Sequence, residues 1–123
     1  MDQDLDQLNV WGRPLKSCSN SPKTGFFRDG FCKTCFEDRG IHTVCVQMTS
    51  DFLEFSKQQG NDLSTPIDEY GFKGLKSGDK WCLCASRWID AYRQGRAPRV
   101  DLDATHEETL AMVPLEVLKK FSL

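Results

Sequence analysis

The residues of this chain that could do chemistry are its cysteines and histidines. The 123 residues include six cysteines and two histidines. In order along the chain they are Cys18, Cys32, Cys35, His42, Cys45, Cys82, Cys84 and His106. Without a secretion signal, cysteine at this density indicates metal binding, thiol chemistry or buried reduced thiols more readily than a disulfide scaffold. The pattern does not choose among these, and spacing cannot give the pairing of any disulfide.

A zinc site would need four cysteine or histidine ligands, commonly in close pairs. Cys82 and Cys84 are two residues apart on a predicted strand, so they share one face about 6.5 Å apart and could bind one ion. His106, with Cys45 or Cys18, could complete that set. The sequence thus gives a zinc module built on Cys82, Cys84 and His106 as an alternative, but it favours no bound metal, because buried reduced cysteine is common.

Cys32 and Cys35 have the spacing of a zinc knuckle and of a redox dithiol. A redox dithiol normally begins at a helix N-terminus, and the neighbours Gly30, Phe31 and Phe36 predict no helix there. Thioredoxin-like exchange is therefore disfavoured.

Nucleophilic catalysis would pair a cysteine with one of the two histidines. His106 is predicted to open a helix, whose positive end disfavours the imidazolium and keeps a ring nitrogen free. His42 follows the charged residues 37–39, so a carboxylate could orient its ring. On a regular strand His42 and Cys45 would point to opposite faces. The candidate catalytic residues are Cys82, Cys84, His106, His42 and Cys45. For each histidine, a purely structural role is the alternative that the sequence favours.

Residues 60–79 are rich in glycine and polar side chains and predict a long loop, which in a compact domain is often functional. Its candidate ligand-binding residues are Asn61, Asp62, Thr65 and Asp79. Asp and Thr in such loops also bond their own backbone, so turn-forming roles are the alternative.

Hydrophobic periodicity predicts strands at residues 41–48, 80–84 and 99–104, and helices at 50–60, 86–94 and from Pro114 onward. A hairpin turn is expected at residues 28–30 and a capping box at 105–108. Strands and short helices interleave irregularly, which favours an α+β class. We expect one domain at residues 9–123 with a short mixed or antiparallel sheet, three to four short helices and a loop-rich N-terminal third. Residues 1–8 should be a disordered acidic tail.

Charge and hydropathy exclude several classes of function. The net charge is -2 and the pI is about 5.6, which argues against a nucleic-acid partner. The apolar runs are far too short to span a bilayer, and the first residues are acidic where a signal peptide would be basic. We therefore expect no membrane partner and a cytoplasmic location.

Five strings of the sequence resemble an uncharacterised, mainly bacterial family, domain of unknown function number 2237. They lie at residues 24–30, 37–45, 60–66, 78–84 and 104–106. The resemblance runs from about Asn9 to Phe121 and implies a single small α+β domain without an assigned activity. It also implies that Cys35 departs from the family pattern, which weakens the zinc-knuckle and redox-dithiol interpretations of the Cys32 and Cys35 spacing.

These observations lead to a hypothesis of a small cytoplasmic enzyme or ligand-binding domain. Its pocket would gather the loop after Gly60, the Cys82 and Cys84 strand, His42 with Cys45, and His106. A zinc module and an interaction domain without chemistry are the two alternatives.

Overall fold

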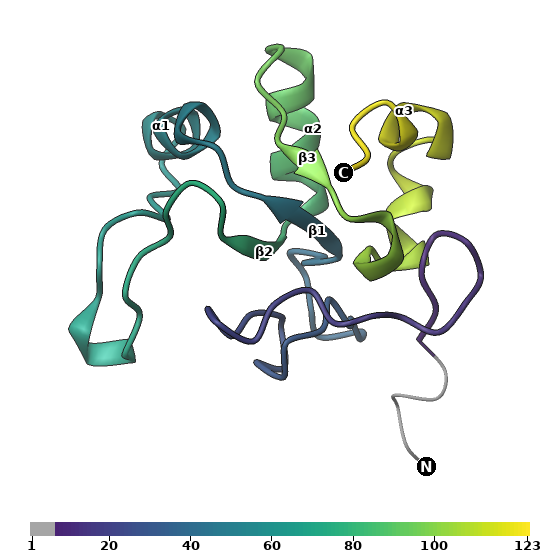
Figure 1. The fold of residues 1–123 in the computed structure, drawn as a ribbon, viewed down its shortest axis with the longest axis horizontal. Helices are drawn as coiled ribbons and strands as arrows, with labels where there is room; N and C mark the ends of the chain where they lie inside the picture. Colours follow the sequence, from purple (N-terminus) through teal and green to yellow (C-terminus); the bar gives the residue numbers. More distant parts are fainter. Residues whose placement is uncertain (1–6) are drawn as a thin grey trace.

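A computed structural model describes residues 7–123 of the chain. Its centre is a three-stranded antiparallel sheet in the order β2-β1-β3 (Figure 1). The strands are β1 (Val44–Gln47), β2 (Lys80–Leu83) and β3 (Arg99–Val100). Cys45 lies opposite Cys82 across the β1 and β2 pair. The α+β class and the antiparallel sheet predicted from the sequence are confirmed.

The central strand β1 is buried on both faces. Val44 and Val46 contribute to the main hydrophobic core, with Leu83 from β2. Cys45 points the other way and belongs to a second, smaller core that also contains Cys82. Side chains alternate between the faces of a strand, so β1 and β2 each contribute apolar residues to one side and a cysteine to the other.

Helices pack on the valine side of the sheet. They are α1 (Ser50–Gln58), α2 (Ala85–Arg93) and α3 (Leu115–Lys119). α1 begins where predicted, because Thr49 Oγ1 accepts a hydrogen bond from Phe52 N at 3.0 Å as the N-cap. α2 places Trp88 in the core, and its indole nitrogen donates to Pro98 O at 3.2 Å. In Figure 1 the N-terminal segment, in purple and blue, runs on the other side of the sheet from these helices.

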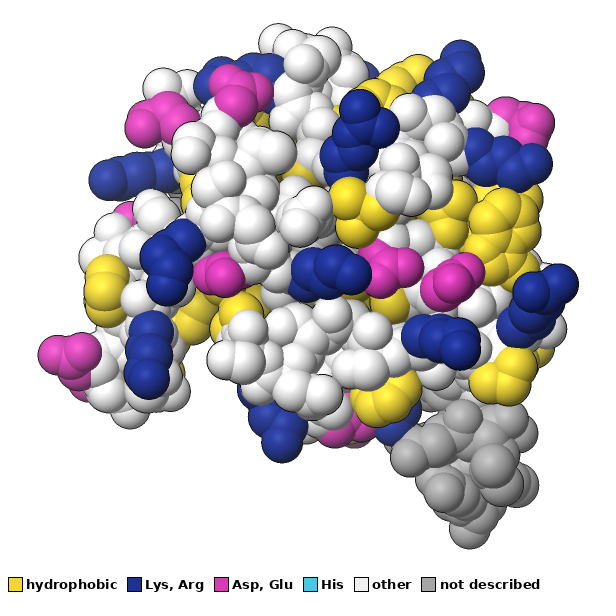
Figure 2. All heavy atoms as spheres, viewed as in Figure 1, with side chains coloured by type: hydrophobic (Ala, Val, Ile, Leu, Met, Phe, Trp, Pro, Cys, Tyr) yellow, Lys and Arg dark blue, Asp and Glu magenta, His cyan; other side chains and the backbone are white. Residues whose placement is uncertain are grey.

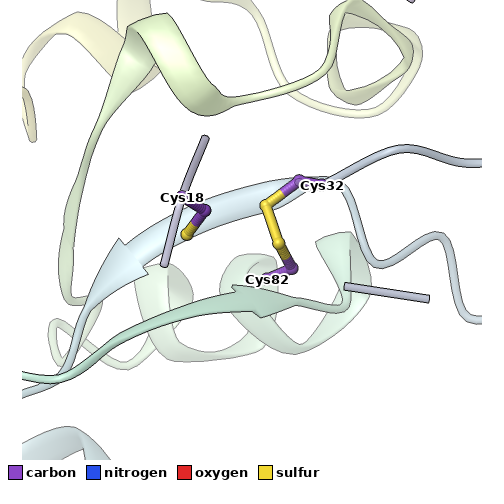
Figure 3. A group of neighbouring side chains, drawn as sticks. All are labelled: Cys18, Cys32 and Cys82. Carbon is purple, nitrogen blue, oxygen red and sulfur yellow. A yellow bond between two sulfur atoms is a disulfide. The ribbon is translucent and has the colours of Figure 1, made fainter. Parts of the chain in front are cut away.

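The N-terminal segment is joined to the sheet by two disulfides. Cys18 pairs with Cys45 of β1, and Cys32 pairs with Cys82 of β2. The Cα atoms of the two pairs lie 5.7 and 5.3 Å apart, within the ordinary range for this bond. Figure 3 shows the Cys32–Cys82 bond with the Cys18 side chain beside it.

These bonds correct the expectation that most of the cysteines are buried reduced thiols. Only Cys35 and Cys84 are free among the cysteines, all of which lie in the described part of the chain. The physical reason is cross-strand pairing. Cys45 and Cys82 project from the same face of adjacent strands, and the segment packed on that face brings one further cysteine to each.

Two predicted elements differ in the structure. The strand predicted for residues 99–104 stops after Val100. Asp101 N still donates to Cys45 O, but Cys45 N donates to a threonine hydroxyl, and the chain turns into a 3-10 helix, Leu102–Ala104. The turn at residues 28–30 joins no paired strands. There Gly30 N donates to Thr24 O at 2.9 Å, which closes a compact loop instead of a hairpin.

The predicted capping box at residues 105–108 is also wrong. Thr105 Oγ1 does not bond Glu108; it accepts from Cys45 N at 3.1 Å and donates to Asp101 O at 2.8 Å. His106 is the N-cap instead, and its Nδ1 accepts from Glu108 N at 3.0 Å. The Thr105 hydroxyl, which the sequence pattern assigned to the helix, therefore serves as the acceptor for a buried backbone N–H of β1.

The predicted loop at residues 60–79 projects from the body as an arm (Figure 1), closed near its tip by backbone pairing between Ile67 and Phe72. Of the expected acidic tail, residues 1–6 lie outside the described residues. Gln7 and Leu8 are hydrogen-bonded to the domain, through Thr34 and Glu107 respectively. Within residues 7–123, no helix is both long and apolar enough to cross a membrane.

Candidate functional site

The register between β1 and β2 brings a free cysteine and a histidine together. Val44 lies opposite Leu83 in this antiparallel pair, so the residues just before β1 must meet those just after β2. His42 and Cys84 occupy these positions. Cys84 is also the N-cap of α2, which puts its side chain at the positive end of that helix.

The side chains of His42 and Cys84 lie next to each other, and Cys84 raises the pKa of His42 as a hydrogen-bonding partner. Gly40 lies against both residues. A Cβ atom at Gly40 would sit 3.0 Å from Cys84 Sγ and 3.1 Å from His42 Nε2. The ring nitrogen on the side of the sulfur is therefore Nε2, and the absence of a side chain at residue 40 leaves room for the pair.

Asp38 holds the other side of the histidine ring. Its Oδ1 lies 2.6 Å from His42 Nδ1, and its side chain is fully buried. Its Oδ2 accepts from His42 N at 2.9 Å and from Thr34 Oγ1 at 3.0 Å. A carboxylate can only accept here, so Nδ1 carries a proton and Nε2 faces the cysteine. The expectation that a carboxylate orients His42 is confirmed, and Asp38 supplies it.

The surroundings of His42 favour its protonated form. The hydrogen bond to Cys84 raises the pKa of His42 most, burial lowers it, and the hydrogen bond to Asp38 raises it again. The result is a pKa of about 9 instead of the ordinary 6.5. At neutral pH the imidazolium therefore lies between a carboxylate and the Cys84 sulfur.

The backbone beside His42 adopts an uncommon conformation. Ile41 has φ of 50°, in the left-handed region that a β-branched residue rarely occupies. Its carbonyl accepts from Ala85 N at 3.0 Å, which ties this segment to the first residue of α2. Strained residues of this kind concentrate at functional sites, and here the strained residue directly precedes His42.

A pocket of about 320 Å³ opens at this pair. We call it the Cys84 pocket, and its lining residues are Gly25, Phe26, Arg28, His42, Asn61, Leu63, Trp81, Cys82, Leu83, Cys84 and Arg87. They come from the N-terminal segment, the base of the arm, β2 and the first turn of α2. Figure 2 shows that the molecule is hollowed between the arm and the body. A second pocket, lined by Arg28, Tyr70 and Trp81 among others, lies between the arm and the N-terminal segment.

The other predicted catalytic residues, Cys45, Cys82 and His106, offer neither a free thiol nor a base beside Cys84. The sulfurs of Cys45 and Cys82 are in disulfides, although Cys82 lines the Cys84 pocket. His106 lines a different pocket, together with Cys35. Burial lowers the pKa of His106, and its Nδ1 accepts a backbone hydrogen bond at the helix it caps. A structural role accounts for these contacts.

Of the predicted binding residues, Asn61 alone lines the Cys84 pocket. Asp62 accepts from Thr65 Oγ1 at 2.6 Å and from Ser64 N at 3.0 Å. The hydrogen bond from Thr65 is the main cause that lowers the pKa of Asp62 to about 2. Asp79 accepts from Lys76 N at 2.9 Å. These contacts build turns within the arm, as the alternative interpretation expected.

Some site residues were not predicted as such. Arg28 was expected only in a turn and Trp81 was not among the candidate site residues, yet both line the pocket. Pairing the predicted strands at 41–48 and 80–84 as antiparallel neighbours would have placed His42 beside Cys84. The arginine has no comparable signal, because its place depends on an irregular loop.

One group of potential metal ligands is compact. The sulfurs of Cys18, Cys32 and Cys82 lie within 4.8 Å of one another (Figure 3). Each is bonded to another cysteine, so none offers a thiolate while the disulfides are intact. The same holds for Cys82 in the predicted zinc set with Cys84 and His106.

Comparisons with known proteins give a family and no activity. The model of a family described as an uncharacterized protein conserved in bacteria, DUF2237, matches residues 8–122. A search of curated proteins found no match to the chain.

Proposed function

We propose, for a chain that belongs to the DUF2237 family of uncharacterised bacterial proteins, that it is an enzyme with Cys84 as a covalent nucleophile. His42 is its general acid and base, and Asp38 is the positioning residue that orients His42. The observation that carries this proposal is geometric: buried Asp38 is hydrogen-bonded to one side of the His42 ring, Cys84 lies on the other side, and His42 and Cys84 both line a pocket. A nucleophile, a base and a group that orients the base are the shared parts of such sites.

The reaction class that this arrangement suits is acyl transfer or hydrolysis. The Cys84 proton already resides on His42 Nε2 in the imidazolium, and the thiolate sulfur attacks a carbonyl carbon to form a sulfur–carbon bond. The leaving group departs with the proton from His42. Water then gives a proton to His42 and attacks the thioester, and Cys84 leaves as the thiolate beside the regenerated imidazolium. Of the two free thiols, Cys84 is the one placed for these steps, because the thiolate is the nucleophile and an adjacent imidazolium favours it.

The proposal is tested by the alkylation rate of Cys84 with iodoacetamide, measured by peptide mass spectrometry without reductant. Cys35 is the internal reference, because it is the other free thiol and has no histidine partner among the hydrogen bonds of the described residues. We expect Cys84 to react about tenfold or more faster than Cys35. His42→Ala and Asp38→Asn should each slow Cys84 and leave Cys35 unchanged. Equal rates at the two cysteines, or a Cys84 rate that ignores both substitutions, would overturn it.

The cytoplasmic location expected from the sequence stays a proposal, and the two disulfides argue against it. Two disulfides are typical of oxidising compartments and are rare in a reducing cytosol. Fractionation of the native cell followed by thiol trapping would decide between the cytosol and an oxidising compartment. Recovery in the cytosolic fraction supports the expectation, and recovery outside it with both disulfides formed contradicts it.

A further inference from the structure

The Cys84 pocket is cationic in a chain whose net charge is -2. Its lining includes Arg28, Arg87 and His42, and no aspartate or glutamate. On the face shown in Figure 2, basic and acidic side chains are interspersed. The positive charge is therefore a local property of the pocket. A concave site lined by one sign of charge concentrates ligands of the opposite sign.

Arg28 is held at the pocket wall by an aromatic contact. Its guanidinium lies over the Trp81 ring, 5.2 Å from the centroid. Its NH1 also approaches Gly25 O at 3.4 Å. Among the described residues, no carboxylate forms an ion pair with it. A guanidinium has five donors, so most of them are available to a ligand.

Arg87 reaches the pocket from the first turn of α2. It follows Cys84 by three residues, so the helix carries both from one end. Its NH1 approaches Gln59 O at 3.4 Å, and it too forms no ion pair within residues 7–123. The helix N-terminus adds a positive potential of its own beside the sulfur.

We propose that the Cys84 pocket binds an electrophile that carries an oxyanion, a carboxylate or a phosphate, and that Arg28 and Arg87 hold this group. The inference rests on the proposed role of Cys84 as the nucleophile and adds the substrate class. Guanidinium groups suit both oxyanions, because their planar donors can form paired hydrogen bonds. The contacts of Arg28 with Trp81 preserve its position, so little side-chain freedom is lost on binding.

The test compares two alkylating reagents that differ in charge. Iodoacetate is anionic and iodoacetamide is neutral; in both cases the thiolate attacks the methylene carbon, a sulfur–carbon bond forms and iodide leaves. The measured quantity is the ratio of the iodoacetate rate to the iodoacetamide rate at Cys84, divided by the same ratio at Cys35. We expect this quotient to be about ten, which is the size of effect that one charge-assisted hydrogen bond gives.

Substitutions assign the effect to the arginines. Arg28→Gln and Arg87→Gln should each lower the iodoacetate rate severalfold and change the iodoacetamide rate less than about twofold, because the neutral reagent lacks the charge. Arg93→Gln is the matched control, since it removes the same charge from the same helix but lies outside the lining of the Cys84 pocket. A quotient of one or less overturns the proposal. So does a raised quotient that neither arginine substitution lowers.

Two competitors distinguish the oxyanions. Acetate and inorganic phosphate are each titrated against iodoacetamide labelling, and the one that protects Cys84 more strongly identifies the preferred group. Protection by neither, at concentrations that leave Cys35 labelling unchanged, counts against an oxyanion site. Failure of the nucleophile proposal looks different, because the iodoacetamide rate of Cys84 would then be independent of His42 whatever the quotient.

Discussion

At the scale of single residues, the site depends on how completely His42 is constrained. Asp38 bonds both its backbone nitrogen and its Nδ1, and Cys84 lies on the other side of the ring. Asp38 itself is buried and needs these partners, since an unpaired buried carboxylate is costly. The same contacts that satisfy Asp38 therefore fix the tautomer and the direction of the ring.

The raised pKa of His42 predicts a pH-dependent contribution to stability. Its folded pKa is about 9 and its ordinary value is 6.5, so the fold stabilises the protonated ring. That contribution is complete below pH 6.5 and is lost as the pH rises through about 9. We expect the difference in unfolding free energy between the wild type and His42→Gln to shrink across this window, as measured by urea denaturation.

His106 provides the opposite case and a control. Burial lowers its pKa, so its contribution is present above its ordinary pKa and is lost as the pH falls. The difference between the wild type and His106→Gln should therefore fall as the pH is lowered through the ordinary range of histidine. A His42 difference that stays constant over its own window would contradict the hydrogen-bonded arrangement.

Gly40 predicts a steric effect on the reactive pair. A Cβ there would lie 2.6 Å from His42 Cε1 and 3.0 Å from Cys84 Sγ. Gly40 is not among the glycines with positive φ, so Gly40→Ala adds a contact without a forbidden backbone conformation. We expect it to displace the ring and slow Cys84 alkylation about tenfold or more, because the base loses alignment. An unchanged rate would contradict this prediction, because it would mean that the added Cβ does not displace His42 from Cys84.

At the scale of elements, threonine hydroxyls complete the hydrogen bonding of the sheet. Thr24 is buried, and its Oγ1 accepts from Cys82 N at 2.9 Å on the edge strand β2. Thr24→Val should cost about 1–3 kcal/mol of unfolding free energy, because a buried N–H loses its acceptor. Thr65→Val is the matched control, since that hydroxyl bonds Asp62 at an exposed site, and it should change stability by less than about 0.5 kcal/mol. Equal effects in urea denaturation would contradict the role of Thr24.

The two disulfides make a second prediction for elements. Removing one bond, with Cys18→Ala and Cys45→Ala together, should cost about 2–4 kcal/mol, because the loop that it closes gains freedom in the unfolded chain. Cys35→Ala removes a free thiol and should be nearly neutral. The urea-unfolded, unreduced protein should show two reactive thiols, Cys35 and Cys84. A count of six would mean that no disulfide forms.

The regular elements follow from local patterns, whereas the contacts between distant segments do not. The valines of β1 and the Thr49 cap of α1 act within a few residues of chain, and the strand and the helix were both predicted in these places. Thr105 was misassigned because its local partner, Glu108, competes with the distant backbone of Cys45, and burial decides in favour of β1. The disulfides have the same origin, since sequence separations of 27 and 50 leave no local signal.

The candidate site shows the same division. Cys84 and His42 were two of the five candidate catalytic residues, and strand register is what selects this pair. Asp38 could be anticipated because it lies four residues before His42. Arg28 could not, because an irregular loop carries it to the pocket and nothing in its neighbours specifies that loop.

At the scale of the whole molecule, the site is assembled across the junction between the sheet and the N-terminal segment. Cys84 belongs to the sheet and helix side, while Asp38 and Arg28 come from the segment that the disulfides hold. Between residues 7 and 40 this segment forms no α-helix and no strand longer than an isolated bridge. Its position on the sheet therefore depends on the disulfides more than on backbone pairing.

Reduction should therefore affect the chemistry of Cys84 through structure. Opening both disulfides with a phosphine, which is oxidised by one oxygen from water for each disulfide reduced, leaves Cys84 itself covalently unchanged. We expect the thermal midpoint to fall and the alkylation rate of Cys84 to approach that of Cys35, because Asp38 no longer fixes His42. In a variant with Cys18, Cys32, Cys45 and Cys82 all changed to alanine, reductant should have no further effect. If the reduced wild type keeps its Cys84 selectivity, the core packing of the N-terminal segment alone is sufficient to hold the site, and the disulfides serve stability only.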